Sequence, residues 1–405
     1  MNICFVSREF IGSKRGGGIA TYVYDMSRSL IAEGHTIYVI CASDNISKKS
    51  KIIYEGINLI KLSGADFYIC NNKNISRILT KIRSILFYNS YRKKIVVALN
   101  ELNNKIGLDI VEFPEFGDEA KFWMRNKNNV VPSVVRFHGP SGHNRTTNTI
   151  NTYSRKVRDE LETAFISDGI SYCSNAIKTL IINTDYSNKL YINFQKIQNI
   201  IFNPIFLEDR LISNKLKKKY IFTAGSFVKN KGFGELVEAI KLINEQGNSI
   251  ELIIAGKLGV LGEFYRNKEL SDSCYSPWLN IVGPLKREDL FNYYKNADLC
   301  CFPSHWESFG LICIEAMSVE GLVLGSSSGG MSEIIEEGKD GFLVEPLNIE
   351  LLKNKIEHIL HLDESKLNEI RKKAKEKIKL QFSSTVICKP VITFYTNVIK
   401  NAKHK

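Results

Sequence analysis

Short apolar runs alternate with longer amphipathic stretches along the chain, and most runs end at a glycine, a proline or a small polar residue. Near-continuous apolar runs are typical of strands that are buried on both faces of a parallel sheet. The stretches between them have apolar residues three or four positions apart, which predicts helices. The clearest runs are residues 2–7, 36–42, 133–137, 220–225, 250–256 and 299–302. This alternation predicts an α/β fold with parallel sheets.

The order of the predicted elements divides the chain into two halves. Residues 205–219 form a polar, lysine-rich stretch before the first strand of the second half. A chain of 405 residues is long enough for two α/β domains of ordinary size. We therefore expect an N-terminal domain at residues 1–204 and a C-terminal domain at residues 205–385. A helix at about residues 386–405 is expected to pack back on the first domain.

Residues 300–346 carry the densest set of signals. A strand ends at Pro303, a polar loop follows, and a helix runs from Leu311 to Val319; a further strand and the small-residue loop 326–330 come next. This order places two loops at one edge of a parallel sheet, where α/β proteins bind ligands. The amide groups and the positive dipole end at the start of the helix suit a phosphate.

Two carboxylates lie in this stretch, Glu307 in the loop and Glu315 inside the helix. At the position of Glu315, one turn into the helix, a carboxylate could accept two hydroxyls of a ribose. Glu307 could hold sugar hydroxyls or stabilise a developing positive charge. Acidic residues near a helix N-terminus also complement the helix dipole, so this simpler role remains open for each of them.

The first half contains a glycine loop, Gly16, Gly17 and Gly18, between the first strand and a helix that begins at Ile19. The fingerprint G-x-G-x-x-G is absent and no acidic residue ends the second strand, which does not favour a nicotinamide cofactor. A glycine loop at a helix N-terminus still lets a phosphate or a sugar approach the backbone closely.

Three further candidates stand at or near strand ends in the first half. His138 follows the strand at residues 133–137, so it leaves the sheet at the edge where ligands collect. Glu112 and Glu115 flank the end of another strand, and they either contact acceptor hydroxyls or face solvent. His143 lies close to His138, but no third ligand accompanies the pair in the sequence, so a zinc site is not expected.

The N-terminus, the apolar runs and the cysteines bear on the cellular compartment of the protein. The N-terminus leads directly into a strand without a signal-peptide pattern, and no run of about 20 apolar residues exists. The nine cysteines form no C-x-x-C motif and most lie in apolar runs. We therefore expect a cytoplasmic protein whose cysteines are reduced.

The net charge of +12 is concentrated in the first half, where residues 1–205 carry 27 Lys and Arg against 17 Asp and Glu. This surplus fits an anionic membrane surface or a phosphorylated acceptor, although a general solubility charge explains it equally well. The stretch Lys73–Lys105 has eight basic residues, one acidic residue and interleaved aromatic side chains. Its pattern predicts either an amphipathic helix on an anionic membrane or a surface helix with its apolar stripe on the core.

Glu307 and Glu315 form an E-x7-E pair within PSHWESFGLICIEAM, and SGGMSEII and GKDGFLVEP follow. This ordered set resembles the signature of the retaining glycosyltransferases of the GT-B fold, sequence family four, also called glycosyl transferases group 1. The resemblance implies two Rossmann-like parallel-sheet domains that face each other across a cleft, with a nucleotide-sugar donor bound by the C-terminal domain. It implies Glu315 at the donor ribose and Glu307 at the transferred sugar.

The resemblance also implies roles for residues outside this stretch. It implies that His138 contacts the donor sugar and that Lys231 grips the diphosphate. The family usually carries an arginine where this chain has Ser226, which can donate a hydrogen bond but has no charge; Lys229 is the nearest replacement. The remaining candidates for stabilising the leaving diphosphate are the backbone amides of Phe309, Gly310, Leu311, Gly16, Gly17 and Gly18.

We therefore expect a retaining glycosyltransferase that moves a sugar from a nucleotide-sugar, a UDP-sugar rather than a GDP-sugar, to a glycan or lipid-linked acceptor. The expected setting is bacterial-type surface polysaccharide or glycolipid synthesis at the inner face of the membrane. The resemblance implies front-face displacement without an enzyme nucleophile, and the absence of a D-x-D motif predicts no obligatory metal. No cofactor is expected, since the nucleotide-sugar is a substrate. A sugar-nucleotide epimerase of the same fold is the alternative. A nucleic-acid partner is not expected, because the basic surplus lies beside sugar-type loops rather than aromatic platforms.

Overall fold

The structure, a computed structural model, describes residues 1–13, 16–44, 49–63, 77–126, 129–192, 194, 196–207, 219–272, 274–275 and 277–402. The chain divides into two compact units. The N-unit comprises Met1–His143, Ile150–Phe206 and Ser384–Lys405, and the C-unit comprises Asn144–Thr149 and Leu207–Ser383. The main boundary, after Phe206, lies close to the one expected after residue 204. The sequence pattern does not predict that Asn144–Thr149 belongs to the C-unit.

The described residues of the N-unit form an eight-stranded sheet in the order β10-β9-β6-β5-β1-β2-β4-β3. Its neighbouring strands are parallel except β3 and β4, an antiparallel pair at one edge. The strand order reverses between β1 and β5, and such a switch point opens a crevice at the carboxyl ends of the strands. The strands are β1 (Asn2–Val6), β2 (Thr36–Ala42), β3 (Ser50–Tyr54), β4 (Ile57–Leu62), β5 (Ile110–Pro114), β6 (Ser133–Phe137), β9 (Gly169–Tyr172) and β10 (Ile197–Ile200).

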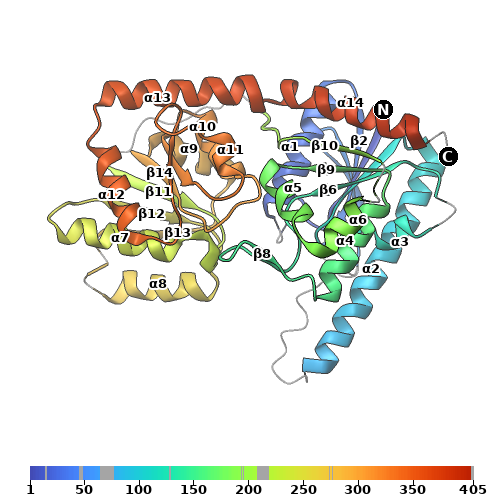
Figure 1. The fold of residues 1–405 in the computed structure, drawn as a ribbon, viewed down its shortest axis with the longest axis horizontal. Helices are drawn as coiled ribbons and strands as arrows, with labels where there is room; N and C mark the ends of the chain where they lie inside the picture. The colour runs from blue at the N-terminus through green and yellow to red at the C-terminus, as the bar shows by residue number, and fades with distance from the viewer. Residues whose placement is uncertain are drawn as a thin grey trace. The chain divides into compact units, whose positions relative to one another are not determined.

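The C-terminal helix α14 lies against α1 and β10 of the N-unit (Figure 1). Its residues Ile387, Val391, Phe394 and Val398 recur at helical spacing and enter the buried core of this unit. The described helices of the N-unit are α1 (Gly18–Ala32), α2 (Arg77–Ile106), α3 (Lys121–Met124), α4 (Arg155–Ile166), α5 (Asn175–Ile182), α6 (Asp185–Ile192) and α14 (Ser384–Ala402). Two short strands, β7 (His143–Asn144) and β8 (Thr149–Ile150), pair with each other in a separate sheet and bracket the residues that lie between them in the chain.

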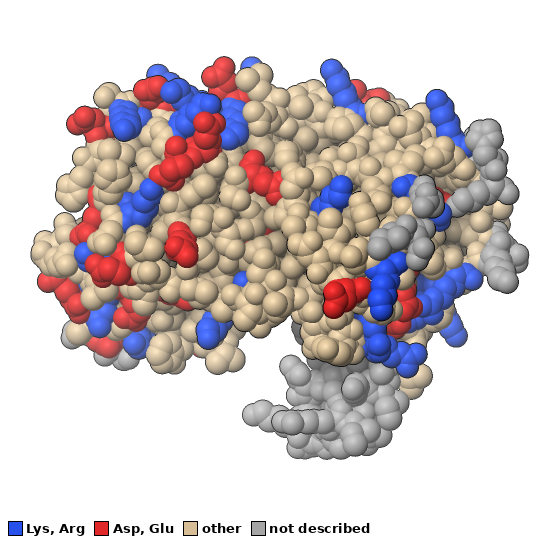
Figure 2. Space-filling model, viewed as in Figure 1, with Lys and Arg blue, Asp and Glu red and all other residues tan. Residues whose placement is uncertain are grey.

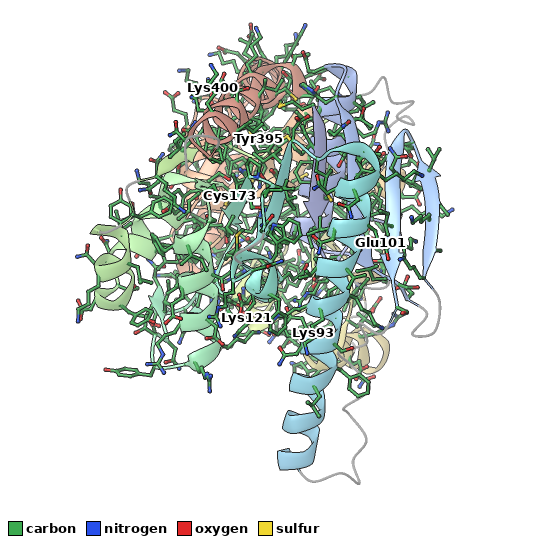
Figure 3. The ribbon with its side chains drawn as sticks, turned by 90° about the vertical axis from the view of Figure 1, so that its right-hand side faces the viewer. Lys93, Glu101, Lys121, Cys173, Tyr395 and Lys400 are labelled. Atoms are coloured by element: carbon green, nitrogen blue, oxygen red, sulfur yellow. The ribbon has the colours of Figure 1, made fainter. Side chains whose placement is uncertain are left out.

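Helix α2 corresponds to the basic stretch of the sequence, and Figure 3 shows Lys93 and Glu101 along it. Ile95, Leu99 and Leu102 are buried at positions i, i+4 and i+7, so this part of the helix packs on the core as a surface helix does. Leu86 is 65% exposed. Residues 73–76 lie outside the described ranges.

The described residues of the C-unit form a six-stranded parallel sheet in the order β13-β12-β11-β14-β15-β16. The order reverses between β11 and β14, which places the switch point of this unit where the loops after these two strands begin. The strands are β11 (Tyr220–Ala224), β12 (Glu251–Ala255), β13 (Leu279–Gly283), β14 (Leu299–Phe302), β15 (Val323–Ser326) and β16 (Phe342–Val344). The described helices are α7 (Phe233–Glu245), α8 (Gly259–Ser271), α9 (Arg287–Asn296), α10 (Leu311–Ser318), α11 (Met331–Ile334), α12 (Ile349–Leu360) and α13 (Glu364–Lys377).

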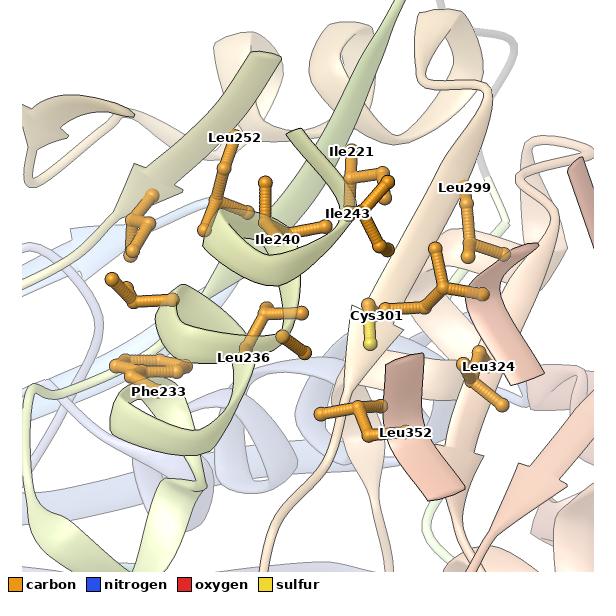
Figure 4. Close-up of a cluster of buried hydrophobic side chains, with 14 of the residues drawn as sticks. Ile221, Phe233, Leu236, Ile240, Ile243, Leu252, Leu299, Cys301, Leu324 and Leu352 are labelled. Atoms are coloured by element: carbon orange, nitrogen blue, oxygen red, sulfur yellow. The ribbon is translucent and has the colours of Figure 1, made fainter. Parts of the chain in front are cut away.

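Helices α7 and α12 pack on the sheet of the C-unit through a continuous apolar core (Figure 4). Leu236 and Ile240 of α7 belong to the same buried cluster as the strand residues Ile221, Leu252 and Leu299. Removing one such buried leucine or isoleucine side chain costs about 2–5 kcal/mol, so this core holds the strand ends in place.

The described cysteines are free thiols and, apart from Cys274, they are buried. Cys70 lies outside the described ranges. Within those ranges, none of the helices is both long and apolar enough to cross a bilayer.

Candidate active site

Two loops of the C-unit meet beyond the carboxyl ends of the neighbouring strands β11 and β14. The loop after β11 ends in a short helical turn, Lys229–Lys231, and the Asn230 carbonyl oxygen accepts a hydrogen bond of 2.9 Å from the His305 amide. Gly232 has a φ angle of 70°, and a Cβ at this position would collide with the carbonyl oxygen of Pro303. Only glycine fits at this close approach. The contact fixes the position of Lys231 relative to the second loop.

Glu307 and Lys231 form an ion pair where the loops meet. The Lys231 ammonium donates to Oε1 of Glu307, and the Ser304 hydroxyl donates to the same oxygen at 2.9 Å. An Arg145 guanidinium nitrogen lies 4.0 Å from Oε2. Burial alone would raise the pKa of Glu307, but the charges of Lys231 and Arg145 outweigh it and hold the pKa below its ordinary value. Glu307 is therefore an ionised carboxylate at neutral pH.

The small-residue loop after β15 fixes the backbone of Glu307. The Gly330 amide donates to the Glu307 carbonyl oxygen at 2.7 Å. Gly329 has a φ angle of 82°, and a Cβ there would collide with the same carbonyl. A Cβ on Gly330 would come within 2.5 Å of the Phe309 Cα. The glycines of the S-G-G sequence thus allow the two loops to pack backbone against backbone.

Helix α10 begins beside this pair and carries Glu315. Gly310, with a φ angle of 105°, is the N-cap residue, so the cap itself has no side chain that could accept from the amides of the first turn. The Glu315 carboxylate lies 3.8 Å from a guanidinium nitrogen of Arg287 and 3.5 Å from the Tyr294 hydroxyl. The predicted group of Glu307, Glu315 and the Phe309–Leu311 turn therefore lies within one loop and the first turns of one helix.

Ser226, where the family pattern usually has an arginine, is exposed, and so is Lys229. The additional cation beside Glu307 is instead Arg145, from the segment Asn144–Thr149. Sequence reasoning missed Arg145, because it stands far from Glu307 in the chain and no motif surrounds it.

His138 of the N-unit is held by the backbone and by a ring contact. Its amide donates to both carboxylate oxygens of Glu115 at 2.9 Å, and the Gly139 amide donates to Oε1 at 2.5 Å. The imidazole lies against the Tyr22 ring, with 4.8 Å between centroids. Burial, with a smaller effect from the nearby Arg136 charge, lowers the pKa of His138 well below its ordinary value. The imidazole is therefore neutral at pH 7.

Glu112 and Glu115 are both buried, and the protein's own donors occupy their carboxylates. Glu112 accepts hydrogen bonds of 2.7 Å from the Tyr22 and Tyr395 hydroxyls. Burial raises the pKa of Glu112, and it raises that of Glu115 to about 8. The solvent-facing interpretation is therefore wrong for both, and a contact with acceptor hydroxyls has no support in these contacts. Glu115 thus fixes the backbone at His138, and Glu112 fixes the hydroxyl of Tyr22, whose ring lies against the His138 imidazole.

The glycine loop of the N-unit leads into α1, whose N-cap is Gly17. Gly16, Gly17 and Gly18 are exposed. A Cβ on Gly17 would lie 2.9 Å from a carboxylate oxygen of Glu9, so the backbone and this side chain already lie close together. In the part of the chain that the structure describes, no group of three or more His, Cys, Asp or Glu side chains could hold a metal ion.

Each of the two units has a mainly parallel sheet with a switch point, which is the arrangement that the GT-B resemblance implies. Residues 207–377 match the model of the family "Glycosyl transferases group 1". This match covers most of the C-unit and confirms the resemblance that the E-x7-E stretch predicts.

Curated relatives match parts of the chain. A capsular polysaccharide biosynthesis glycosyltransferase, CapM of Staphylococcus aureus, is 28% identical over 256 residues, which are 60% of this chain and 64% of CapM. A lipopolysaccharide 1,2-N-acetylglucosaminetransferase of Salmonella typhimurium is 28% identical over 172 residues, 40% of this chain and 43% of that protein. The chain thus spans less than two thirds of the length of these relatives.

Solved structures match almost the whole chain. Sucrose-phosphate synthase from Thermosynechococcus elongatus superposes with a TM-score of 0.77 at 19% identity, over 99% of both chains. The trehalose-6-phosphate synthase OtsA gives a TM-score of 0.71 at 11% identity, over 98% of this chain and 99% of that one. Anabaena HepE, solved with UDP and glucose, gives 0.63 at 16% identity, over 98% and 99%. These likenesses confirm the predicted fold class.

Proposed function

We propose that the protein is a retaining glycosyltransferase that moves a sugar from a nucleotide-sugar to a glycan or lipid-linked acceptor. The observation that carries the proposal is the Glu307–Lys231 pair at the switch point of the C-unit, beside the first turn of α10, whose N-cap is Gly310. A nucleotide-sugar needs a cation for its diphosphate and a carboxylate for its sugar or ribose hydroxyls. The site offers both groups side by side, because Lys231 and Glu307 contact each other.

In the proposed reaction the bond between the anomeric carbon and the diphosphate oxygen breaks, and its electron pair stays on that oxygen. The acceptor hydroxyl oxygen bonds to the anomeric carbon from the same face, and its proton passes to the departing phosphate. Lys231 and the amides of the Phe309–Leu311 turn stabilise the negative charge that grows on the phosphate. Glu307 orients the sugar, Glu315 binds the ribose, and His138 supplies a neutral hydrogen-bonding imidazole to the sugar.

We propose a UDP-sugar as donor and surface polysaccharide or glycolipid synthesis as setting. HepE was solved with UDP and glucose, and the relatives are named for capsular polysaccharide and lipopolysaccharide synthesis. We also propose that no metal is required, because Lys231 and Arg145 supply positive charge beside Glu307. Retained activity after treatment with EDTA is the expected result.

The test compares wild type with Glu307→Gln. First, thermal shifts with UDP-, GDP-, ADP- and dTDP-sugars identify the donor, since a bound ligand stabilises the folded state by mass action. Proton NMR then follows the anomeric signal of donor and product. We expect wild type to retain the anomeric configuration of the sugar. Turnover should fall at least 100-fold in Glu307→Gln and stay unchanged in Glu369→Gln, which alters an exposed carboxylate on α13. Unchanged turnover in Glu307→Gln contradicts the proposal, and isomerised donor without acceptor would indicate an epimerase instead.

A further inference from the structure

The segment Asn144–Thr149 belongs to the C-unit although the chain on either side of it belongs to the N-unit. The strands β7 and β8 pair at its two ends. Inside the loop, the Asn144 side-chain oxygen accepts hydrogen bonds from the Thr146 amide at 3.1 Å and the Thr147 amide at 3.3 Å. These bonds give the loop a defined turn, with Arg145 at its start.

A buried histidine anchors this loop to the C-unit. The Nδ1 atom of His305 lies 3.0 Å from the Thr146 hydroxyl, and its Nε2 atom lies 2.8 Å from a carboxylate oxygen of Glu235 on the first turn of α7. The His305 side chain is fully buried. Both ring nitrogens are therefore engaged, and the residue next to Arg145 is fixed to the same loop that carries Glu307.

Arg145 and Lys231 approach opposite oxygens of Glu307. Lys231 contacts Oε1, whereas the guanidinium of Arg145 stands 4.0 Å from Oε2, which is the outer limit of an ion pair. Arg145 keeps 31% of its side chain exposed. Among the described residues, these two cations face one carboxylate, so the group has a positive surplus that an anion can neutralise.

We propose that Arg145 binds the donor diphosphate together with Lys231, and so fills the role of the arginine that the family pattern places at Ser226. A guanidinium presents a planar fork of donors that matches two phosphate oxygens, which a serine hydroxyl cannot do. When the diphosphate binds, Arg145 turns from Glu307 to the phosphate oxygens, and Glu307 becomes available to the sugar. The inference rests on the proposed function, because it requires a nucleotide donor at this site.

The test separates diphosphate binding from nucleoside binding. Calorimetry measures the affinity of the full chain for the best ligand among UDP, GDP, ADP and dTDP, and for the matching monophosphate. In Arg145→Ala we expect a loss of diphosphate affinity of about tenfold or more, since one charge-assisted hydrogen bond alone accounts for about tenfold and the fork can form two, and less than about a twofold loss for the monophosphate. Arg266→Ala, an exposed arginine on α8, is the matched control and should bind both as wild type does.

Two further variants guard against a folding defect. Arg145→Lys keeps the charge but loses the fork, so its diphosphate affinity should lie between those of wild type and Arg145→Ala. Thr146→Val keeps Arg145 but removes the hydroxyl that anchors its loop to His305. It should weaken the binding of the diphosphate more than the binding of the monophosphate. Equal affinity of wild type and Arg145→Ala for the diphosphate overturns the inference, as does an equal loss for both ligands. If wild type binds no nucleotide at all, the proposed function itself fails.

Discussion

The ion pair between Lys231 and Glu307 predicts a pH-dependent stability change that does not require knowledge of the substrate. In Lys231→Met the carboxylate stays buried and loses its direct cation, while Ser304 and Arg145 remain. Breaking a fully buried pair costs about 3–5 kcal/mol. Here Lys231 is 25% and Glu307 12% exposed, and other partners persist, so we expect a loss of about 1–2 kcal/mol at pH 7.

The sign of the pH dependence follows from the pKa of Glu307. In wild type the pKa lies below its ordinary value, so the pair contributes stability above pH 5 that is lost as the pH falls through the folded-state pKa. Without Lys231, burial is opposed less and the pKa rises. The variant carboxylate then takes up a proton on mild acidification, which relieves the buried charge. The stability deficit of Lys231→Met should therefore shrink by about half or more between pH 7 and pH 5.

Urea unfolding of wild type and variant at both pH values measures this deficit. When Glu307→Gln is already present, no buried carboxylate charge is left without a partner. Lys231→Met should then lower the free energy of unfolding by less than about 0.5 kcal/mol. Lys339→Met removes a surface pair with Glu336, in which both side chains are 58% exposed, and is the control for loss of a lysine. The stability loss caused by Lys231→Met would refute the coupling between Lys231 and Glu307 if it were equal at pH 7 and pH 5. It would also refute the coupling if it were equal with Glu and with Gln at position 307.

Three further predictions concern the proposed activity and the membrane. Gly329→Ala should lower turnover at least tenfold, as measured by release of nucleoside diphosphate, because its Cβ collides with the carbonyl of Glu307 and displaces that residue; wild-type turnover would contradict the close packing of the loops. The loss of rate in His138→Ala should be the same from pH 7 to pH 8, because burial lowers the pKa of His138 well below its ordinary value; a loss that varies with pH in this window would mean that the imidazole titrates there. Sedimentation with vesicles rich in anionic lipid should recover more protein than sedimentation with neutral vesicles, and Leu86→Glu on α2 should reduce it; equal recovery would reject membrane association.

The distribution of surface charge bears on that last prediction. Figure 2 shows acidic and basic side chains next to one another on the face in view. In the C-unit, Lys373 pairs with Glu369 and Lys375 pairs with Glu320. The C-unit thus neutralises much of its own charge, and the sequence surplus lies in residues 1–205.

The sequence predicted best those parts of the site that are close together in the chain. The strand before Pro303 and the helix from Leu311 agree with β14 and α10 within a residue, because apolar runs and glycines mark their limits locally. The family resemblance implies that Glu307 and Lys231 both serve the donor, but it does not predict their ion pair. Their contact depends on β11 and β14 being neighbours, a long-range property of the sheet.

Three features could not be predicted from local pattern. Arg145 reaches Glu307 only because six residues of the first half fold with the second. Glu112 and Glu115 look like ordinary polar residues at a strand end, yet tyrosine hydroxyls and backbone amides from distant segments satisfy them inside the unit. His305 reads as one polar residue of a loop, and its role as an anchor depends on α7 and the segment Asn144–Thr149 together.

The central claim is that the C-unit binds a nucleotide-sugar through Lys231 and Glu307. Calorimetric titration of wild type, Lys231→Met and Glu307→Gln with the donor found by thermal shift, and with its nucleoside diphosphate, tests it most directly. We predict one site per chain, weaker binding of both ligands by Lys231→Met, and a selective loss of the sugar contribution in Glu307→Gln. Binding that is the same in all three proteins would contradict the claim.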